Sequence, residues 1–159
     1  MGANLVINTP QAPASPEDAV IAGDGFYPDI DANAMRSDLR IDDTVTHEQL
    51  VAAVEGAIIY VTGQLASWRA EQEEAGFATI AAVNAATVNG KNRLEMLYAR
   101  AVRFQASSEI WELHRAISAT SDGQSRANND ELSSDEYERQ ATLAIRQITG
   151  VTQSAVELI

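Results

Sequence analysis

Few residues of this chain have the chemistry of a catalytic or metal-binding group, and they lie far apart in the sequence. There is no Cys, and the two histidines are His47 and His114. A thiolate nucleophile and a Cys-based zinc site are therefore excluded, and a site for another transition metal has little support. His47 stands near Asp42, Asp43 and Glu48, a grouping that could act as an acid–base cluster. We interpret these acids instead as groups attracted by the positive end of a nearby helix.

Sequence motifs of the common enzyme and nucleotide-binding classes are missing as well. The sequence contains no P-loop, no GxGxxG and no GxSxG. The acidic pairs Asp29/Asp31 and Glu73/Glu74 are compatible with weak cation sites, but neither has the EF-hand pattern. We therefore predict no catalytic residues, no metal ligands and no cofactor. A structural or binding role is favoured, and a small enzyme that uses carboxylates alone stays as a third possibility behind the two discussed below.

Length, composition and charge describe a single acidic domain. The chain has 159 residues, 45% of them hydrophobic, and a formal net charge of −12. No run approaches the ~20 apolar residues of a membrane span, and the N-terminus lacks the features of a signal peptide, so we expect the protein in the cytosol. The charge is uneven, because residues 1–49 hold nine acids and two bases, whereas residues 91–120 hold three acids and five bases. Such an acidic protein binds nucleic acid poorly without specificity, and suits a surface that DNA slides past.

The pattern of apolar residues predicts a first long helix over residues 46–74. Thr46 and Gln49 form a capping box at its start, and Gly76 is placed to end it in the left-handed conformation. Its apolar stripe recurs at steps of three and four residues and comprises Leu50, Val54, Ile58, Val61, Leu65 and Trp68. Gly56 and Gly63 lie inside this helix, either as tolerated surface residues or as points where another helix approaches closely.

A second long helix is predicted over residues 92–120, with Asn92 and Glu95 as its capping pattern. Its apolar stripe is wide, which favours a central position in the fold. Arg93, Arg100 and Arg103 share one face. That face either is solvated, with partners in its own helix, or contacts an acidic neighbour or DNA phosphate.

The third helix is predicted over residues 134–150, from a capping box at Ser133 and Glu136 to Gly150. Residues 77–89 could form a short helix or an extended connection, and Asn89-Gly90 signals a turn.

These elements predict an all-α fold, a small bundle of three to four helices with an extended N-terminal arm and a C-terminal tail. Residues 1–25 are rich in Ala, Pro, Asp and Gly and form the predicted flexible arm, and residues 26–159 form the helical domain. A single helical turn is predicted at 31–37, capped by Asp31. The tail ends in the apolar residues Val156, Leu158 and Ile159, which pack on their own domain or dock on a partner.

Several short motifs follow one another along the chain. They are FYPDID at 26–31, LR at 39–40, TVTHEQL at 44–50, Trp68-Arg69, Gly76-Phe77, LYARAV at 97–102, Gly123, Ala144-Ile145 and VELI at 156–159. In their order and spacing the chain resembles the head completion (head stabilisation) proteins of tailed phages, the GPL family, over residues 26–159. Leu143 departs from the family pattern, which has an aromatic residue before Ala-Ile, and this affects only local packing.

The resemblance implies a structural virion protein with no catalytic residues. Such proteins act after genome packaging at the vertex where DNA enters the capsid. They form a ring beneath the portal, which for this chain would be a dodecamer. The ring retains the DNA, which passes through the channel without sequence-specific binding, and gives the neck or tail-completion protein a docking surface. The implied location is the neck region of the virion, and the host cytoplasm before assembly.

The candidate interface residues follow from these features. Phe26 and Tyr27 lie in the FYPDID segment, which packs either on its own helices or on a neighbouring subunit. We expect the three arginines to pair with an acidic surface of the adjacent subunit, and Val156, Leu158 and Ile159 to dock on a ring component. The alternative is a helical protein–protein adaptor unconnected with phage, acting as a monomer or dimer.

Overall fold

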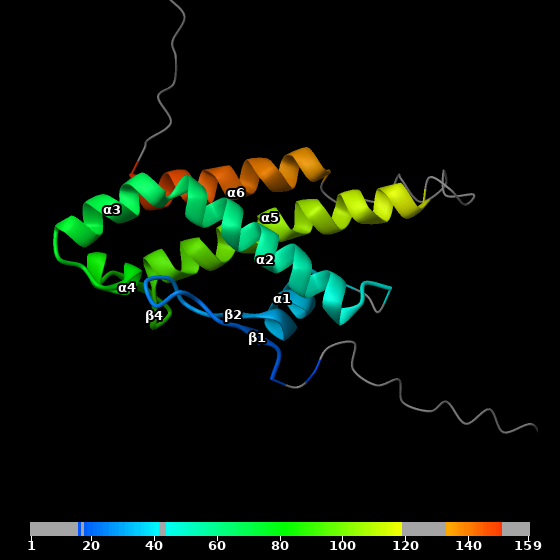
Figure 1. Cartoon of the computed structure of the whole chain (residues 1–159), viewed down its shortest axis with the longest axis horizontal. Coiled ribbons are helices and arrows are strands. Elements are labelled where there is room, and N and C mark those ends of the chain that lie inside the picture. The colour runs from blue at the N-terminus through cyan, green and yellow to red at the C-terminus, as the bar shows by residue number, and fades with distance from the viewer. Residues whose placement is uncertain (1–15, 17, 42–43, 119–132, 151–159) are drawn as a thin grey trace, which may run out of the picture.

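Three long helices dominate the fold in the computed structural model, which describes residues 16, 18–41, 44–118 and 133–150. The longest, α5 (Arg93–Ser118), packs against both α2 (His47–Gln64) and α6 (Ser134–Thr149). Figure 1 shows α6 along one side of the molecule and the small N-terminal elements on the opposite side. The mainly helical architecture and the central position of α5 confirm the predicted fold class.

The predicted helix over residues 46–74 is divided in two by a sharp bend. α2 ends at Gln64, α3 (Ala66–Glu74) follows, and the two axes differ by 61°. Near the bend, the Thr62 Oγ1 hydroxyl donates to the Ile58 carbonyl at 2.8 Å, a back-bond that favours helix bending. Gly63 adds backbone freedom at the next position. The apolar stripe did not reveal the bend because Leu65 stays fully buried at it.

The predicted helix ends are confirmed at most positions. Thr46 and Gln49 exchange both hydrogen bonds of a capping box, and the Asn92 Oδ1 accepts from the amides of Leu94 and Glu95. Ser133 accepts from the Glu136 amide at 3.3 Å, which is one half of the predicted box.

The glycines predicted to end helices also have the expected conformation. Gly76 and Gly150 have φ angles of 94° and 73°, the left-handed region that lets a helix end without strain. After α3, the Phe77 amide donates to the Gln72 carbonyl and the Gly76 amide to the Glu73 carbonyl, the two hydrogen bonds of a Schellman motif.

The ambiguous stretch 77–89 contains both predicted alternatives. It forms the short helix α4 (Ile80–Val83) and then β3 (Thr87–Val88), which pairs antiparallel with β4 (Lys91–Asn92). The hairpin turns at Asn89 and Gly90, whose φ angles of 50° and 75° match the turn type that Asn-Gly favours.

The N-terminal elements pack beneath α2 and α5. β1 (Val20–Ile21) pairs antiparallel with β2 (Ile30–Asp31), and α1 (Ala32–Asp38) follows directly. The Asp31 carboxylate caps α1 by accepting from two of its amides, as predicted. Much of the predicted arm at residues 1–25 lies outside the described residues, but its last part, β1, belongs to the packed fold.

Among the described residues, no single helix has the length and apolar character of a membrane span. Taken together, α2 and α3 have the length and composition of a span, but the pair is bent by 61°.

Candidate assembly surfaces

Phe26 and Tyr27 lie in the core, inside a cluster of four aromatic rings with Trp68 and Tyr98. The Tyr27 ring stacks on Tyr98 with centroids 4.6 Å apart. The Phe26 ring meets the edges of Tyr27 at 5.0 Å and of Trp68 at 6.3 Å. This aromatic cluster joins the FYPDID segment to α3 and α5. The Phe26 amide carbonyl also accepts from the Ile80 amide at 2.9 Å, which ties in α4.

A charged clamp covers the aromatic cluster. The Arg69 guanidinium lies 4.8 Å from the Phe26 ring centre and 5.5 Å from that of Tyr27, in cation–π contact with both. It forms ion pairs with Asp24 and with Glu73. The Asp24 carboxylate in turn accepts from the amides of Phe26 and Tyr27, each at 3.1 Å. The Trp-Arg pair and the FYPDID segment, distant in sequence, therefore form one unit.

The environment of the clamp shifts the pKa values of Asp24 and Tyr27. Partial burial raises the pKa of Asp24, but the hydrogen bonds from the Tyr27 amide and Arg69 outweigh it and leave the pKa below its ordinary value. Burial raises the pKa of Tyr27 to about 12. Phe26 and Tyr27 are each only 3% exposed, so in this conformation the segment packs on its own helices and neither ring is available to a partner.

The three arginines of α5 that were predicted as interface residues, Arg93, Arg100 and Arg103, differ in their surroundings. Arg103 forms an ion pair with Asp38 of α1 at 2.6 Å, and Arg100 contacts Gln140 of α6 at 3.4 Å. Both guanidinium groups also lie within 6 Å of the Phe104 ring, at 5.2 Å and 5.6 Å. These partners come from other elements, not only from α5 itself. Arg93 is exposed, and no partner for it occurs among the described residues.

The outward surface of α2 exposes large apolar side chains that the sequence analysis did not single out. Ile59 is 72% exposed and Tyr60 is 43% exposed. A methyl group added at Gly63 would meet no atom within 4 Å. We call Ile59, Tyr60 and Gly63 the outer face of α2. The signal that could have found it was the presence of apolar residues away from the buried stripe.

Gly56 differs from Gly63, because a neighbouring element approaches it. A methyl group there would lie 2.9 Å from a carboxylate oxygen of Glu109 on α5. Glu109 is exposed at the surface, but partial loss of solvation still raises the pKa of its carboxyl above the ordinary value. The predicted close approach at Gly56 is therefore made by a side chain.

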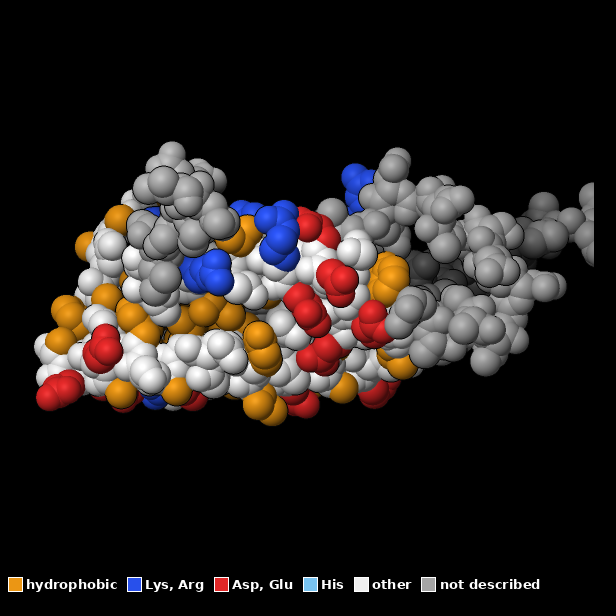
Figure 2. Space-filling model, turned by 90° about the horizontal axis from the view of Figure 1, so that it is seen from above, with side chains coloured by type: hydrophobic (Ala, Val, Ile, Leu, Met, Phe, Trp, Pro, Cys, Tyr) orange, Lys and Arg blue, Asp and Glu red, His pale blue; other side chains and the backbone are white. Residues whose placement is uncertain are grey.

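Figure 2 shows acidic side chains grouped on one face, with apolar side chains exposed beside them.

The possible acid–base cluster at His47 has the geometry of a helix start. The Glu48 pKa is lowered by hydrogen bonds from its own amide and from Thr46, so this carboxylate serves the N-terminus of α2. Asp42 and Asp43 lie outside the described residues, as does the side chain of His114. Within the described parts of the chain, no group of three or more acidic or His residues could hold a metal ion.

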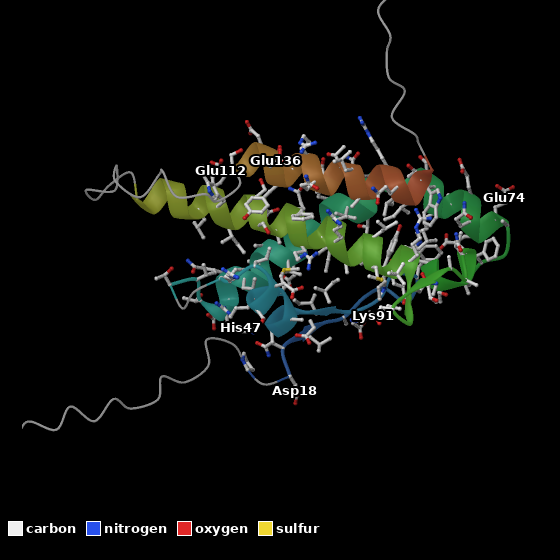
Figure 3. The ribbon with its side chains drawn as sticks, turned by 180° about the vertical axis from the view of Figure 1, so that it is seen from behind. Asp18, His47, Glu74, Lys91, Glu112 and Glu136 are labelled. Atoms are coloured by element: carbon white, nitrogen blue, oxygen red, sulfur yellow. The ribbon has the colours of Figure 1, made fainter. Side chains whose placement is uncertain are left out.

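His47 also lines a shallow hollow of about 500 Å³ between β1 and α2. Figure 3 shows Asp18 and His47 on the side of the molecule away from Glu136 and α6. The tail residues Val156, Leu158 and Ile159 lie outside the described residues, so the structure gives them no position.

Comparison with known proteins gives a family match over nearly the whole chain. The pattern of the phage head completion protein (GPL) family matches residues 21–159. The head completion/stabilization protein of Escherichia phage P2 is 29% identical over 166 aligned residues, which cover 98% of each chain. No solved structure matches the chain.

Proposed function

Because the chain belongs to the phage head completion protein (GPL) family, we propose that it forms a ring below the portal once the genome is packaged. The ring stabilises the filled capsid and gives the neck or tail-completion protein a docking surface. Membership in this structural family confirms the prediction that the chain is not an enzyme and makes it a component of the phage head. The ring, its dodecameric state and its partners are our proposal.

The observation that carries the ring is the outer face of α2. Ile59 is 72% exposed, although the same helix buries a complete stripe against α5. Exposed apolar residues such as Ile59 and Tyr60, next to a glycine such as Gly63 that leaves room for a close approach, favour contact with another helix. We place a second copy of this chain on that face. The contact joins different surfaces of two copies, and such a contact gives a ring when repetition of its rotation closes on itself, as we propose here.

The distribution of exposed charged residues supports the proposed contact between neighbouring copies in the ring. Arg93 and Arg100 are exposed on α5, and Glu71 and Glu74 are exposed on α3, which buries no residue of its own. In the ring, the two arginines of one copy face the acids of the next. Arg103 supports this surface from within, through its ion pair with Asp38.

The two ends of the chain reach the other partners. Figure 1 shows that the described residues begin on the side of β1 and end on the side of α6. We propose that Val156, Leu158 and Ile159 dock on the portal or on the neck protein. Phe26 and Tyr27 act indirectly, by fixing the segment from Asp24 to Asp31 on the helices. The net charge of −12 keeps packaged DNA from adhering to the channel wall.

The test is the mass of the purified protein measured with and without the portal. A ring that forms on the portal supports the proposal. A monomer or dimer that ignores the portal supports the alternative, a helical adaptor unconnected with head completion.

A further inference from the structure

The hollow between β1 and α2 lies against a strand edge with which no other described segment pairs. It is lined by the segment from Asp18 to Ala22 and, from α2, by His47, Val51 and Glu55. Within the described residues the sheet of β1 has two strands, with β2 on one side of β1. A two-stranded sheet is marginally stable alone, and an open edge accepts a further strand.

The hydrogen bonds show which backbone groups of β1 are open. The Ala32 amide donates to the Ala19 carbonyl, and Ile21 is paired with Ile30, so residues 19 and 21 face β2. The backbone amide and carbonyl of Val20 point away from β2. The Val20 amide donates a hydrogen bond to the Asp18 carbonyl, but among the described residues the Val20 carbonyl accepts none. The Val20 side chain is 56% exposed beside this edge.

The sequence of residues 1–15 has the properties of a suitable occupant. Leu5, Val6 and Ile7 form an apolar run, and β-branched residues such as Val and Ile favour strands. Residues 1–15 contain no charged side chain. Asp18 and Glu55 at the hollow are acidic, so a segment that brings no further acidic side chain suits this site.

The prolines between this run and the hollow favour a neighbouring copy over the same copy. Pro10 and Pro13 follow the apolar run, and Pro16 itself lines the hollow. Pro-rich segments extend by about 3.1 Å per residue and resist tight reversal. An extended linker of eight residues, the number between Ile7 and Pro16, spans about 25 Å. We propose that residues 4–8 of one copy add as a third strand to β1 of the next copy in the ring. This arm exchange rests on the ring proposed above.

A cross-linking experiment in filled heads tests the exchange. The chain has no Cys, so Leu5→Cys, Val6→Cys or Ile7→Cys can each be co-produced with Val51→Cys as separate copies. Side chains alternate along a strand. We expect a disulfide-linked dimer for positions 5 and 7 or for position 6, but not for all three. Val88→Cys, at an exposed position of the β3–β4 hairpin, replaces Val51→Cys in the control and should give no dimer.

The outcomes separate this inference from the proposed function. If the protein is present in filled heads but no arm position links, or all three link equally, the arm exchange is wrong and the ring stands. If Ile7→Cys and Val51→Cys link within one chain of the isolated protein, the arm occupies its own hollow and the exchange is again wrong. If the protein is absent from filled heads, the ring fails, and the exchange fails with it.

Removal of residues 1–9 gives an independent readout. We expect the shortened chain to keep its helical circular dichroism and thermal transition but to lose ring formation on the portal. Normal rings from the shortened chain would overturn the exchange without affecting the ring proposal.

Discussion

The ring of Tyr27 stacks on the ring of Tyr98 at 4.6 Å, with their planes 13° from parallel. This contact joins the N-terminal segment to the central helix across 71 positions of sequence. Because both rings are buried, their packing contributes to folding and not directly to assembly. The same distinction between folding and assembly separates the predictions that follow.

Tyr27→Ala should lower the free energy of unfolding by about 3–5 kcal/mol, the usual cost of removing a large buried aromatic ring. Tyr27→Phe should be neutral or slightly stabilising, because the buried Tyr27 hydroxyl has no hydrogen-bond partner in the described structure. Urea unfolding measures both, with the exposed Tyr60→Ala as the control. A large loss for Tyr27→Phe would mean that the hydroxyl has a partner after all.

Asp24→Asn should flatten the loss of stability in acid. The folded-state pKa of Asp24 is below its ordinary value of 3.8, so its contribution is present above pH 3.8 and is lost as the pH falls through the folded value. The free energy of unfolding, measured between pH 5 and pH 2, should therefore decrease less steeply with falling pH in the variant than in the wild type. Equal slopes for the two proteins would show that the clamp of Asp24 and Arg69 adds nothing to stability.

Glu109→Gln should have the opposite sign of pH dependence. Partial loss of solvation raises the folded-state pKa of Glu109 above the ordinary 4.5, so the wild-type residue costs stability as the pH rises through the folded value. The variant should be more stable than wild type at pH 7, and this advantage should disappear below pH 4.5. A variant that is less stable at pH 7 would contradict the raised pKa of Glu109.

Gly63→Ala should raise the free energy of unfolding of the isolated protein by about 0.5–1 kcal/mol, because Ala is the better helix former and the site is open. Gly56→Ala is the matched variant, and it should gain less because the new methyl group must displace the Glu109 carboxylate. If Gly63 is where a second copy approaches, Gly63→Ala should also weaken ring formation. If the Gly63→Ala variant assembles fully, Gly63 is not part of the contact between subunits.

Ile59→Glu should leave folding unchanged within about 0.5 kcal/mol but abolish ring formation. The side chain is 72% exposed, so a charge costs little in the monomer and much in a buried contact. Assembly on the portal, followed by sedimentation, measures the loss. Val88→Glu, exposed on the hairpin, is the control and should assemble normally.

The parts of the fold that could be predicted from sequence are those set by neighbouring residues. The caps at Thr46 and Asn92 and the helix end at Gly150 depend on side chains within three or four positions. The bend at Leu65 could not be predicted from periodicity, because Leu65 continues the apolar stripe across it.

The candidate surfaces were harder to predict, since exposure depends on which elements pack together. From the sequence, Phe26 and Tyr27 could pack on their own helices or on a neighbouring subunit, and only the structure shows that they pack against Trp68 and Tyr98 of distant helices. Ile59 was hard to find for the opposite reason, because in an apolar helix the only sign that it faces outward is its position away from the buried stripe. The family, in contrast, was predicted from short motifs, and the match to residues 21–159 confirms it.

Electron cryo-microscopy of purified filled heads tests the central claim most directly. The account predicts a ring of this protein immediately below the portal, with the outer face of α2 at each contact between copies. Filled heads whose vertex lacks this protein, or holds it as isolated monomers away from the portal, would contradict the account.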